Sequence, residues 1–298
     1  MTALTTLWQS HGLNPDAVIG HSQGEITAAH ISGALTLEDA AKIVALRSQA
    51  LQTLHGSGGM ASVPLPADQV TELLHTTWPD QLWVAAVNAP TATVISGDAK
   101  ALTQALEHYR DQGIDAKRIP VDYASHCPHI QAVEQELPNL LRGITPRAAT
   151  TPFYSTTDNQ WTDTTTLTPH YWYRNLRQPV HLAQAITNLT HQGHHTYIEI
   201  SPHPTLTPPS KNHQHHQHHR HHQHTHHRHQ HTPPQPQRHH QILHALAHAH
   251  TTGHPSTGTP PPTPHPTPNT PTCPPTPSNT NATGSTPPPT QETSPPSA

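Results

Sequence analysis

The pattern of hydrophobic and polar positions near the N-terminus predicts two helices separated by a short buried strand. Residues 2–10 carry apolar side chains on one helical face, namely Ala3, Leu4, Leu7 and Trp8. Residues 17–19 form an apolar run of strand length, and residues 26–31 continue with helical spacing. Because few residues separate the strand from the second helix, we expect a sharp turn between them.

A longer amphipathic helix is predicted from residue 37 to about residue 55. Thr36 precedes it as the N-cap, Asp39 follows three positions later as in a capping box, and Gly56 ends it. Its apolar stripe consists of Ala40, Ile43, Val44, Ala50, Leu51 and Leu54. Arg47 lies within this stripe. A buried guanidinium is unfavourable unless it is paired, so the pattern predicts a structural ion pair, a stem that reaches solvent, or an anionic ligand.

Between residues 58 and 120 the pattern changes to that of a small separate unit. Strands are predicted over residues 60–65, 82–87, 93–96 and 114–121, and helices over residues 67–75 and 98–112. This order, strand-helix-strand-strand-helix-strand, is that of a ferredoxin-like unit. Residues 133–205 return to the larger unit, with a buried strand expected over residues 197–200. An inserted unit beside a larger one predicts a cleft in which a ligand binds.

Composition separates the end of the chain from the rest. Most of the 35 prolines and 33 histidines fall in the last third. Residues 208–298 are first His-rich and then rich in Pro and Thr, with too little apolar surface to offset chain entropy, so we expect this tail to be disordered. Only residues 242–250 carry a helical pattern there.

Charge and composition exclude several classes of protein. The formal net charge of −4 provides no basic field for nucleic acid. The sequence contains no apolar run long enough to span a membrane and no secretory signal. Two cysteines give no disulfide framework. We therefore expect a soluble cytoplasmic protein.

Candidate chemistry begins at the predicted turn, which reads Gly20-His21-Ser22-Gln23-Gly24. A G-x-S-x-G pattern between a strand and a helix is typical of a nucleophile elbow. The Ser22 hydroxyl would then be exposed at the start of the helix, and the backbone N–H of Gln23 could hold an oxyanion. By itself, the pentapeptide also fits an ordinary turn that contains a serine.

Four motifs together resemble the acyltransferase domains of modular type I polyketide synthases. They are His21-Ser22-Gln23-Gly24-Glu25, Tyr123-Ala124-Ser125-His126, the run from Tyr171 to Val180, and the run from Glu199 to Pro204. They occur in the family's order and at about its spacing, over residues 1 to about 207. The resemblance implies an α/β-hydrolase-like acyltransferase core, residues 1–57 and 121–207, with the ferredoxin-like unit, residues 58–120, inserted into it.

The resemblance also implies the roles of individual residues. Ser22 is acylated, His126 takes the proton from its hydroxyl, and Gln23 contributes to the oxyanion hole. The backbone carbonyl of Asn175 orients His126, so a dyad replaces the triad of hydrolases. Arg47 pairs with the free carboxylate of a malonyl-type extender unit, which would account for its place in an apolar stripe.

Substrate selectivity follows from the same likeness. Family members with Gln after the serine and with a Tyr-Ala-Ser-His run, here Gln23 and Tyr123, Ala124 and Ser125, mostly accept methylmalonyl-CoA. Members with His-Ala-Phe-His accept malonyl-CoA, and Ser125 leaves more space for a methyl group than Phe would. No metal or bound cofactor is implied. The partners are the CoA thioester, the phosphopantetheine of an acyl carrier protein, and neighbouring ketosynthase domains.

The likeness is incomplete at both ends. Family domains carry a preceding Gly-Gln-Gly segment that completes the oxyanion hole, so we expect a truncated domain with reduced or no activity. At the other end the His-rich tract replaces family-like sequence. A coding frame that slips near residue 209 and again after residue 255 would explain both tracts, because shifted Thr codons yield His and Pro.

Two other functions are compatible with part of the sequence. An α/β serine hydrolase or thioesterase would need an acid from Asp98, Asp115 or Asp122, and it would have no use for Arg47. A His-rich metal-binding or disordered interaction protein would use the tract from His213 to His231 to bind Ni²⁺, Cu²⁺ or Zn²⁺ through imidazole.

Overall fold

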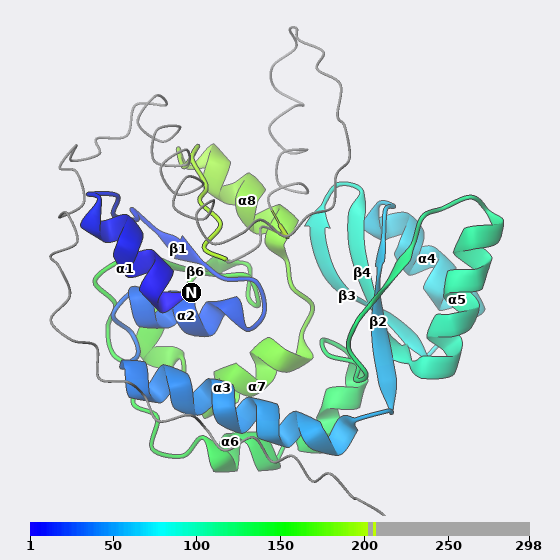
Figure 1. The fold of residues 1–298 in the computed structure, drawn as a ribbon, viewed down its shortest axis with the longest axis horizontal. Coiled ribbons are helices and arrows are strands. Elements are labelled where there is room, and N and C mark those ends of the chain that lie inside the picture. The colour runs from blue at the N-terminus through cyan, green and yellow to red at the C-terminus, as the bar shows by residue number, and fades with distance from the viewer. Residues whose placement is uncertain (202–204, 207–298) are drawn as a thin grey trace, which may run out of the picture. The chain divides into compact units, whose positions relative to one another are not determined.

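The computed structural model describes residues 1–201, 205 and 206, which all belong to one compact unit, Met1–Thr257. They form two sheets, one with strand order β1-β6-β7 and one with order β3-β4-β2-β5 (Figure 1). The predicted α/β class is therefore confirmed. The predicted tail, residues 208–298 with its His-rich tract, lies outside the described residues.

The larger part of the described chain surrounds the three-stranded sheet. Strand β1 (Val18–Ile19) pairs in parallel with β6 (Phe153–Ser155), and β6 pairs antiparallel with β7 (Gln160–Trp161). The helices of this part are α1 (Thr2–Ser10), α2 (Gly24–Ile31), α3 (Leu37–Leu51), α6 (Glu136–Leu140), α7 (Pro169–Arg177) and α8 (Leu182–His191). Short 3-10 turns are η1 (Gln52–Leu54), η2 (Pro128–Val133) and η3 (Thr164–Thr166).

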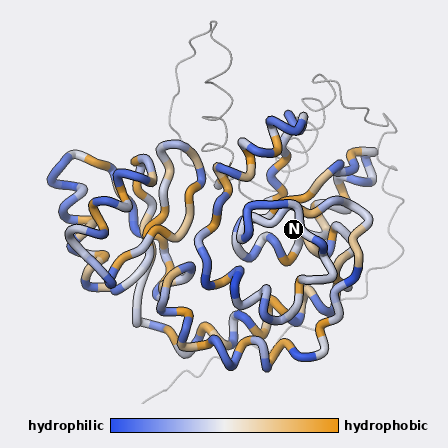
Figure 2. The backbone as a smooth tube through the Cα atoms, turned by 180° about the vertical axis from the view of Figure 1, so that it is seen from behind, coloured by the Kyte–Doolittle hydropathy of each residue, from blue (hydrophilic) through white to orange (hydrophobic). Residues whose placement is uncertain are grey.

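The packing of α2, α3, α6 and α7 forms the main hydrophobic core. Ile26, Ile43, Leu137 and Trp172, one from each helix, are almost fully buried in it. Figure 2 shows hydrophobic and hydrophilic positions alternating along these helices, as expected for helices with one buried face. The α3 helix begins as predicted, because the Thr36 hydroxyl accepts a hydrogen bond from the Asp39 N–H at 3.0 Å.

The second sheet is built from residues 58–119. Its elements are β2 (Gly58–Val63), α4 (Ala67–Thr77), β3 (Leu82–Ala89), β4 (Ala92–Asp98), α5 (Ala99–Asp111) and β5 (Lys117–Ile119). All its pairings are antiparallel, and β2 lies between β4 and β5, which is the strand order of a ferredoxin-like unit. Both helices pack on the same face of this sheet, where Val70 and Leu102 meet Ala61 and Ile95 (Figure 1).

The segment after α7 connects the two sheets. Val180 forms a parallel bridge with Ala86 of β3, exchanging hydrogen bonds of 2.9 Å with Val87 and Ala85. On the other side, the N–H of His181 donates to the carbonyl of Thr156, next to β6, at 2.9 Å. This double attachment fixes residues 178–181 close to the predicted catalytic residues.

One sequence-based expectation about this architecture is wrong. Residues 197–200 do not form a strand; the Tyr197 hydroxyl instead contacts Thr190 and the carbonyl of Ile186 on α8. The segment therefore packs against α8 instead of joining the sheet of β1, β6 and β7. Helix α1 forms as predicted, with Leu7 of its apolar face 37% exposed and Thr5 buried.

No helix in the described part of the chain is long and apolar enough to cross a membrane.

Candidate active site

The turn between β1 and α2 has the geometry of a nucleophile elbow. Ser22 adopts a left-handed backbone conformation with φ of 54°, which is uncommon for a residue other than glycine. A side chain at position 20 would be impossible, because its Cβ would lie 2.2 Å from the backbone nitrogen of Glu25. Gly24 has open space around it. Gly20 is thus the glycine that the tight turn requires.

The elbow brings Ser22 to the predicted base. Oγ of Ser22 lies 2.7 Å from Nε2 of His126, a residue 104 positions later in the chain. His126 is almost fully buried. Its Nδ1 lies 2.7 Å from the backbone carbonyl oxygen of Gln178, which only accepts hydrogen bonds. Nδ1 therefore carries the proton, and Nε2 is left to accept the proton of Ser22.

The expectation that the backbone carbonyl of Asn175 orients His126 is wrong. The orienting carbonyl is that of Gln178, and the N–H of His126 also donates to the carbonyl of Leu176 at 2.9 Å. Asn175 lies inside the last turn of α7, whereas Gln178 follows the end of the helix with extended backbone, ψ 153°. A carbonyl beyond the helix end is free to turn toward another group.

Burial sets the protonation of the base. It lowers the pKa of His126 to about 3, with the nearby charge of Arg47 acting in the same direction and the Gln178 carbonyl opposing it. The imidazole is therefore neutral at neutral pH, as a general base must be.

Arg47 lies at the same site, as its position in the apolar stripe of α3 predicts. Its side chain is buried, and Nη2 lies 3.3 Å from Oγ of Ser22 while Nη1 donates to Oδ1 of Asn175 at 2.6 Å. Burial lowers the pKa of Arg47 to about 10, so the guanidinium stays charged at neutral pH. Its Nε is buried and has no hydrogen-bond partner among the described residues.

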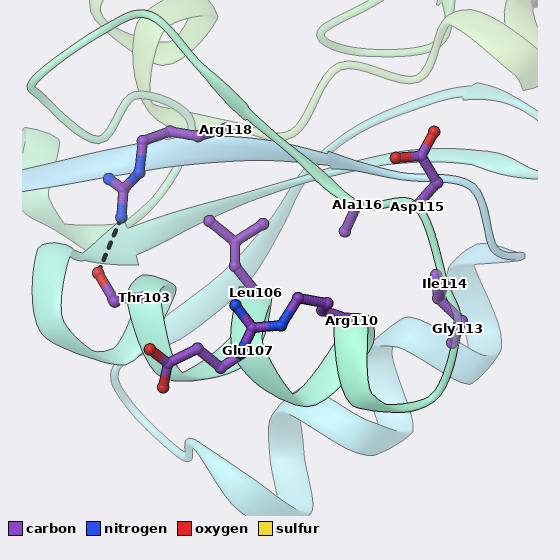
Figure 3. A pocket seen from close by; sticks show the side chains of 9 residues that line it. All are labelled: Thr103, Leu106, Glu107, Arg110, Gly113, Ile114, Asp115, Ala116 and Arg118. Carbon is purple, nitrogen blue, oxygen red and sulfur yellow. Dashed lines mark hydrogen bonds between the residues drawn. The ribbon is translucent and has the colours of Figure 1, made fainter.

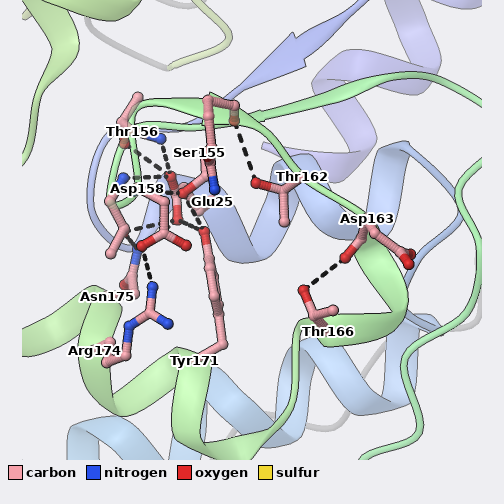
Figure 4. Close-up of polar contacts among 12 residues, drawn as sticks. Glu25, Ser155, Thr156, Asp158, Thr162, Asp163, Thr166, Tyr171, Arg174 and Asn175 are labelled. Carbon is pink, nitrogen blue, oxygen red and sulfur yellow. Dashed lines mark hydrogen bonds and ion pairs between the residues drawn. The ribbon is translucent and has the colours of Figure 1, made fainter.

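Sequence reasoning missed the buried carboxylate of Glu25, which Asn175 connects to Arg47. Figure 4 shows Glu25 among its polar neighbours, which include Thr156, Tyr171 and Asn175. Asn175 Nδ2 donates to Glu25 Oε2 at 2.8 Å and to the backbone carbonyl of Ser22 at 3.2 Å. The Tyr171 hydroxyl also donates to Oε2, at 2.7 Å, and the N–H of Thr156 donates to Oε1 at 2.5 Å. The sequence signals were its place in the motif from His21 to Glu25 and an acidic residue at the start of a largely apolar helix.

The remaining predicted residues surround the dyad. Gln23 is the N-cap of α2, and its N–H makes no backbone hydrogen bond within the described residues, so it is available for an oxyanion. Tyr123 is half-buried and Ala124 fully buried. The Ser125 hydroxyl donates to Sδ of Met60 on β2 at 3.2 Å.

A second contact joins the elbow to the small sheet. Nε2 of His21 lies 2.8 Å from Oδ1 of Asn88 on β3. Burial lowers the pKa of His21, so this ring is also neutral at neutral pH. Together with the Ser125–Met60 contact, it places the dyad where the two sheets meet.

The aspartates that a hydrolase triad would need are engaged elsewhere. Asp98 pairs with His129 at 2.9 Å, Asp115 with Lys117 at 2.8 Å, and Asp122 with His55 at 2.6 Å. The group that orients His126 is a carbonyl, so the described site is a dyad.

A hollow on the surface of the small sheet does not belong to this site. It is lined by α5 and the segment that follows, including Arg110 and Arg118 (Figure 3). None of Ser22, His126 and Arg47 lines it.

Comparison with known proteins identifies the family. Residues 1–255 match the acyl transferase domain family. The chain belongs to this family. Polyketide synthase GfsA of Streptomyces halstedii is 52% identical over 206 residues, which are 69% of this chain and 3% of that protein. Erythronolide synthase EryA2 of Saccharopolyspora erythraea is 49% identical over 206 residues, which are 69% of this chain and 6% of that protein.

Solved structures show the same likeness. The acyltransferase domain from module 8 of the salinomycin polyketide synthase has a TM-score of 0.69 at 45% identity, over 71% of this chain and 50% of that one. The malonyl CoA-acyl carrier protein transacylase of Coxiella burnetii has a TM-score of 0.66 at 28% identity, over 71% and 69%. The resemblance to polyketide synthase acyltransferases is confirmed, and so is the acyltransferase class of the domain. Because the chain spans only a small part of the synthases, their overall activities do not transfer to it directly.

Proposed function

We propose that this acyltransferase domain transfers a carboxylated extender unit from CoA to the phosphopantetheine thiol of an acyl carrier protein, through an ester on Ser22. The proposal depends on one observation: the imidazole of His126 and the guanidinium of Arg47 both lie within hydrogen-bond distance of Oγ of Ser22. Nε2 of His126 lies 2.7 Å from it and Nη2 of Arg47 lies 3.3 Å from it. A base and a fixed cation around one hydroxyl suit an acyl group that ends in a carboxylate.

The first half of the reaction forms the acyl-enzyme. Oγ of Ser22 attacks the thioester carbonyl carbon while Nε2 of His126 takes the hydroxyl proton. The N–H of Gln23, at the start of α2, stabilises the oxyanion of the tetrahedral intermediate. The carbon–sulfur bond then breaks, and His126 returns the proton to the CoA sulfur.

The second half reverses these roles. The phosphopantetheine thiol gives its proton to Nε2 of His126 and attacks the ester carbonyl. The ester bond to Ser22 breaks, and Oγ regains the proton. The hydrogen bond from Nδ1 to Gln178 holds the ring in one tautomer through both halves.

Arg47 is proposed to bind the free carboxylate of the acyl group. Nη1 of Arg47 already donates to Oδ1 of Asn175, whereas Nε has no hydrogen-bond partner among the described residues. The edge of the guanidinium formed by Nε and Nη2 is therefore the one proposed to face a substrate. This edge offers two parallel N–H donors, which match the two oxygens of a carboxylate.

The proposed extender unit is methylmalonyl, with malonyl as the alternative. Ser125, next to His126, is smaller than the Phe of malonyl-type members, and its hydroxyl contacts Sδ of Met60 at 3.2 Å; this supports room for a methyl group at that position. One methyl group in a pocket is worth about 1–3 kcal/mol, so this preference is modest compared with the effect of the carboxylate.

Acylation of the full chain tests the proposal. The chain is mixed with methylmalonyl-CoA, malonyl-CoA or propionyl-CoA, and the acyl group is located by mass spectrometry of peptides. We expect an ester on Ser22, formed fastest from methylmalonyl-CoA and passed on to a phosphopantetheine-loaded carrier protein. Propionyl-CoA differs from methylmalonyl-CoA by the free carboxylate alone, so equal rates with these two would contradict the role of Arg47. An ester on another serine would contradict the role of Ser22.

A further inference from the structure

Burial raises the pKa of Glu25, and hydrogen bonds donated by Tyr171, Thr156 and Asn175 oppose this rise by stabilising the carboxylate. The carboxyl group is fully buried on the second residue of α2. Such a group is stable only if hydrogen bonds replace its hydration. Both oxygens accept from several donors, which belong to Thr156, Thr157, Tyr171 and Asn175.

A series of hydrogen bonds from Asp158 to Glu25 is compatible with Glu25 acting as an acceptor. The N–H of Asp158 donates to Oγ of Ser155 at 2.9 Å, and Oγ of Ser155 lies 2.7 Å from the Tyr171 oxygen, to which its hydroxyl can donate. The Tyr171 proton is then directed to Glu25 Oε2. The chain ends on the carboxylate, which supplies no proton in return.

A carboxylate that only accepts fixes the orientation of the Asn175 amide. Oε2 of Glu25 requires the NH₂ group, 2.8 Å away, and this turns the amide oxygen toward Nη1 of Arg47 at 2.6 Å. The reversed amide would set oxygen against carboxylate and NH₂ against guanidinium. Asn175 thus connects an anion to a cation without allowing them to neutralise each other directly.

We propose that Glu25 and Asn175 are positioning residues for Arg47. Glu25 sets the amide of Asn175, and the amide oxygen holds Nη1, so that the Nε–Nη2 edge is presented to the carboxylate of the acyl group. This inference rests on the proposed function, because it assigns the carboxylate to Arg47. A network with a structural role alone would hold α2 and α7 together but would not alter the choice between acyl groups.

Two substitutions and their combination separate these roles. Glu25→Gln removes the anion to which Nδ2 of Asn175 donates, so the amide is held less firmly, and Asn175→Asp places a carboxylate directly on Arg47. In the double variant the new amide at position 25 can donate to the new carboxylate at position 175, so the hydrogen bond between these two side chains is restored. The carboxylate still neutralises Arg47 in that variant.

The measured quantity is the preference for methylmalonyl-CoA over propionyl-CoA. It is obtained from single-turnover acylation of Ser22 in the full chain and from calorimetric affinities, so a slow enzyme still gives a result. We expect each single variant to lower the preference by about 10- to 100-fold, the usual value of a hydrogen bond to a charged group, with propionyl-CoA little affected. The double variant should regain thermal stability but not the preference.

Matched variants provide the controls. Glu38→Gln and Asn139→Asp make the same changes at exposed positions and should leave the preference unchanged. Tyr171→Phe removes a donor to Glu25 without touching Asn175, and it should lower the melting temperature while keeping the preference.

The outcomes distinguish this inference from the proposed function. If Arg47→Ala keeps the wild-type preference, the carboxylate does not bind Arg47, and both proposals fail. If Arg47→Ala loses the preference but folded Glu25→Gln and Asn175→Asp keep it, only the positioning role fails. Recovery of the preference together with stability in the double variant would assign the network a structural role.

Discussion

Ser22 and His126 face each other at 2.7 Å, and both have left-handed backbone conformations, with φ of 54° and 60°. Each such residue costs about 1–3 kcal/mol unless the surrounding structure holds it. Gly20 permits the turn at Ser22, and the carbonyls of Leu176 and Gln178 hold His126 from two sides. Backbone geometry therefore fixes the proposed nucleophile and base, and the group that orients His126 is a carbonyl, not an acidic residue.

The left-handed backbone at Ser22 predicts that two substitutions there differ in stability. Ser22→Ala and Ser22→Gly should both abolish acylation. Glycine accepts a positive φ without strain, so Ser22→Gly should be more stable than Ser22→Ala by about 1 kcal/mol. Thermal unfolding of both variants measures this, with Ser48→Ala, at an exposed serine, as the control for acylation. Equal stability of the two variants would mean that the turn is relaxed.

The buried arginine and the elbow could be predicted because their signals are local. Arg47 interrupts an apolar stripe with a helical period, and Ser22 lies between a strand and a helix in a fixed pattern. The partner of His126 could not be predicted in this way. It depends on where α7 ends and on how residues 178–181 attach to β3, which are contacts between distant parts of the chain.

The wrong or missing predictions also concern contacts between distant parts of the chain. Residues 197–200 have strand-like composition, but the Tyr197 hydroxyl bonds to Thr190 and Ile186 of α8, contacts that composition does not reveal. Glu25 was not predicted to be functional, because its carboxylate accepts hydrogen bonds from residues more than 130 positions away along the chain, such as Thr156 and Asn175. Periodicity identifies which faces are buried, and it does not identify the polar groups that meet there.

The lowered pKa of His126 predicts activity that persists in mild acid. The folded value is about 3, against an ordinary 6.5, so the base stays neutral well below pH 6.5. The rate of Ser22 acylation should therefore show no loss near pH 6.5. Arg47→Ala removes a charge that lowers this pKa, so its acid limb should move to higher pH, measured with propionyl-CoA.

The same shift has a consequence for stability. Because the folded pKa is lower than the unfolded one, the unfolded chain binds more protons between about pH 3 and 6.5. The contribution of His126 is present above pH 6.5 and is lost as the pH falls toward 3. His126→Gln should thus lose less stability than the wild type on acidification, as measured by denaturant unfolding. A wild-type rate that declines with a midpoint near 6.5 would contradict the shifted pKa.

Selectivity should depend on Met60 as well as on the motif at residues 123–126. Tyr123→His with Ser125→Phe should shift preference toward malonyl-CoA, since Phe fills space beside the dyad. The Ser125 hydroxyl lies 3.2 Å from Sδ of Met60, so the larger ring must displace that side chain, at a cost of about 1–3 kcal/mol.

Adding Met60→Ala to these two changes should therefore restore stability and complete the shift. The test compares the ratio of specificity constants for malonyl-CoA and methylmalonyl-CoA among the double and triple variants. An unchanged ratio in both would mean that other residues form the methyl pocket.

The two glycines of the elbow should respond differently to the same substitution. In Gly20→Ala the new Cβ would lie 2.2 Å from the backbone nitrogen of Glu25, and backbone atoms cannot give way as a flexible side chain can. We expect the free energy of unfolding to fall by about 3 kcal/mol or more, the upper end for overpacking, and acylation to be lost because Ser22 moves away from His126.

Gly24→Ala is the matched control, since no atom lies within 4 Å of its Cβ and position 24 begins α2. Alanine is the better helix former, so this variant should gain up to about 1 kcal/mol and keep its activity. Denaturant unfolding and mass spectrometry of the acylated chain measure both effects. If Gly20→Ala were as stable and active as Gly24→Ala, the elbow could not be as tight as the structure shows.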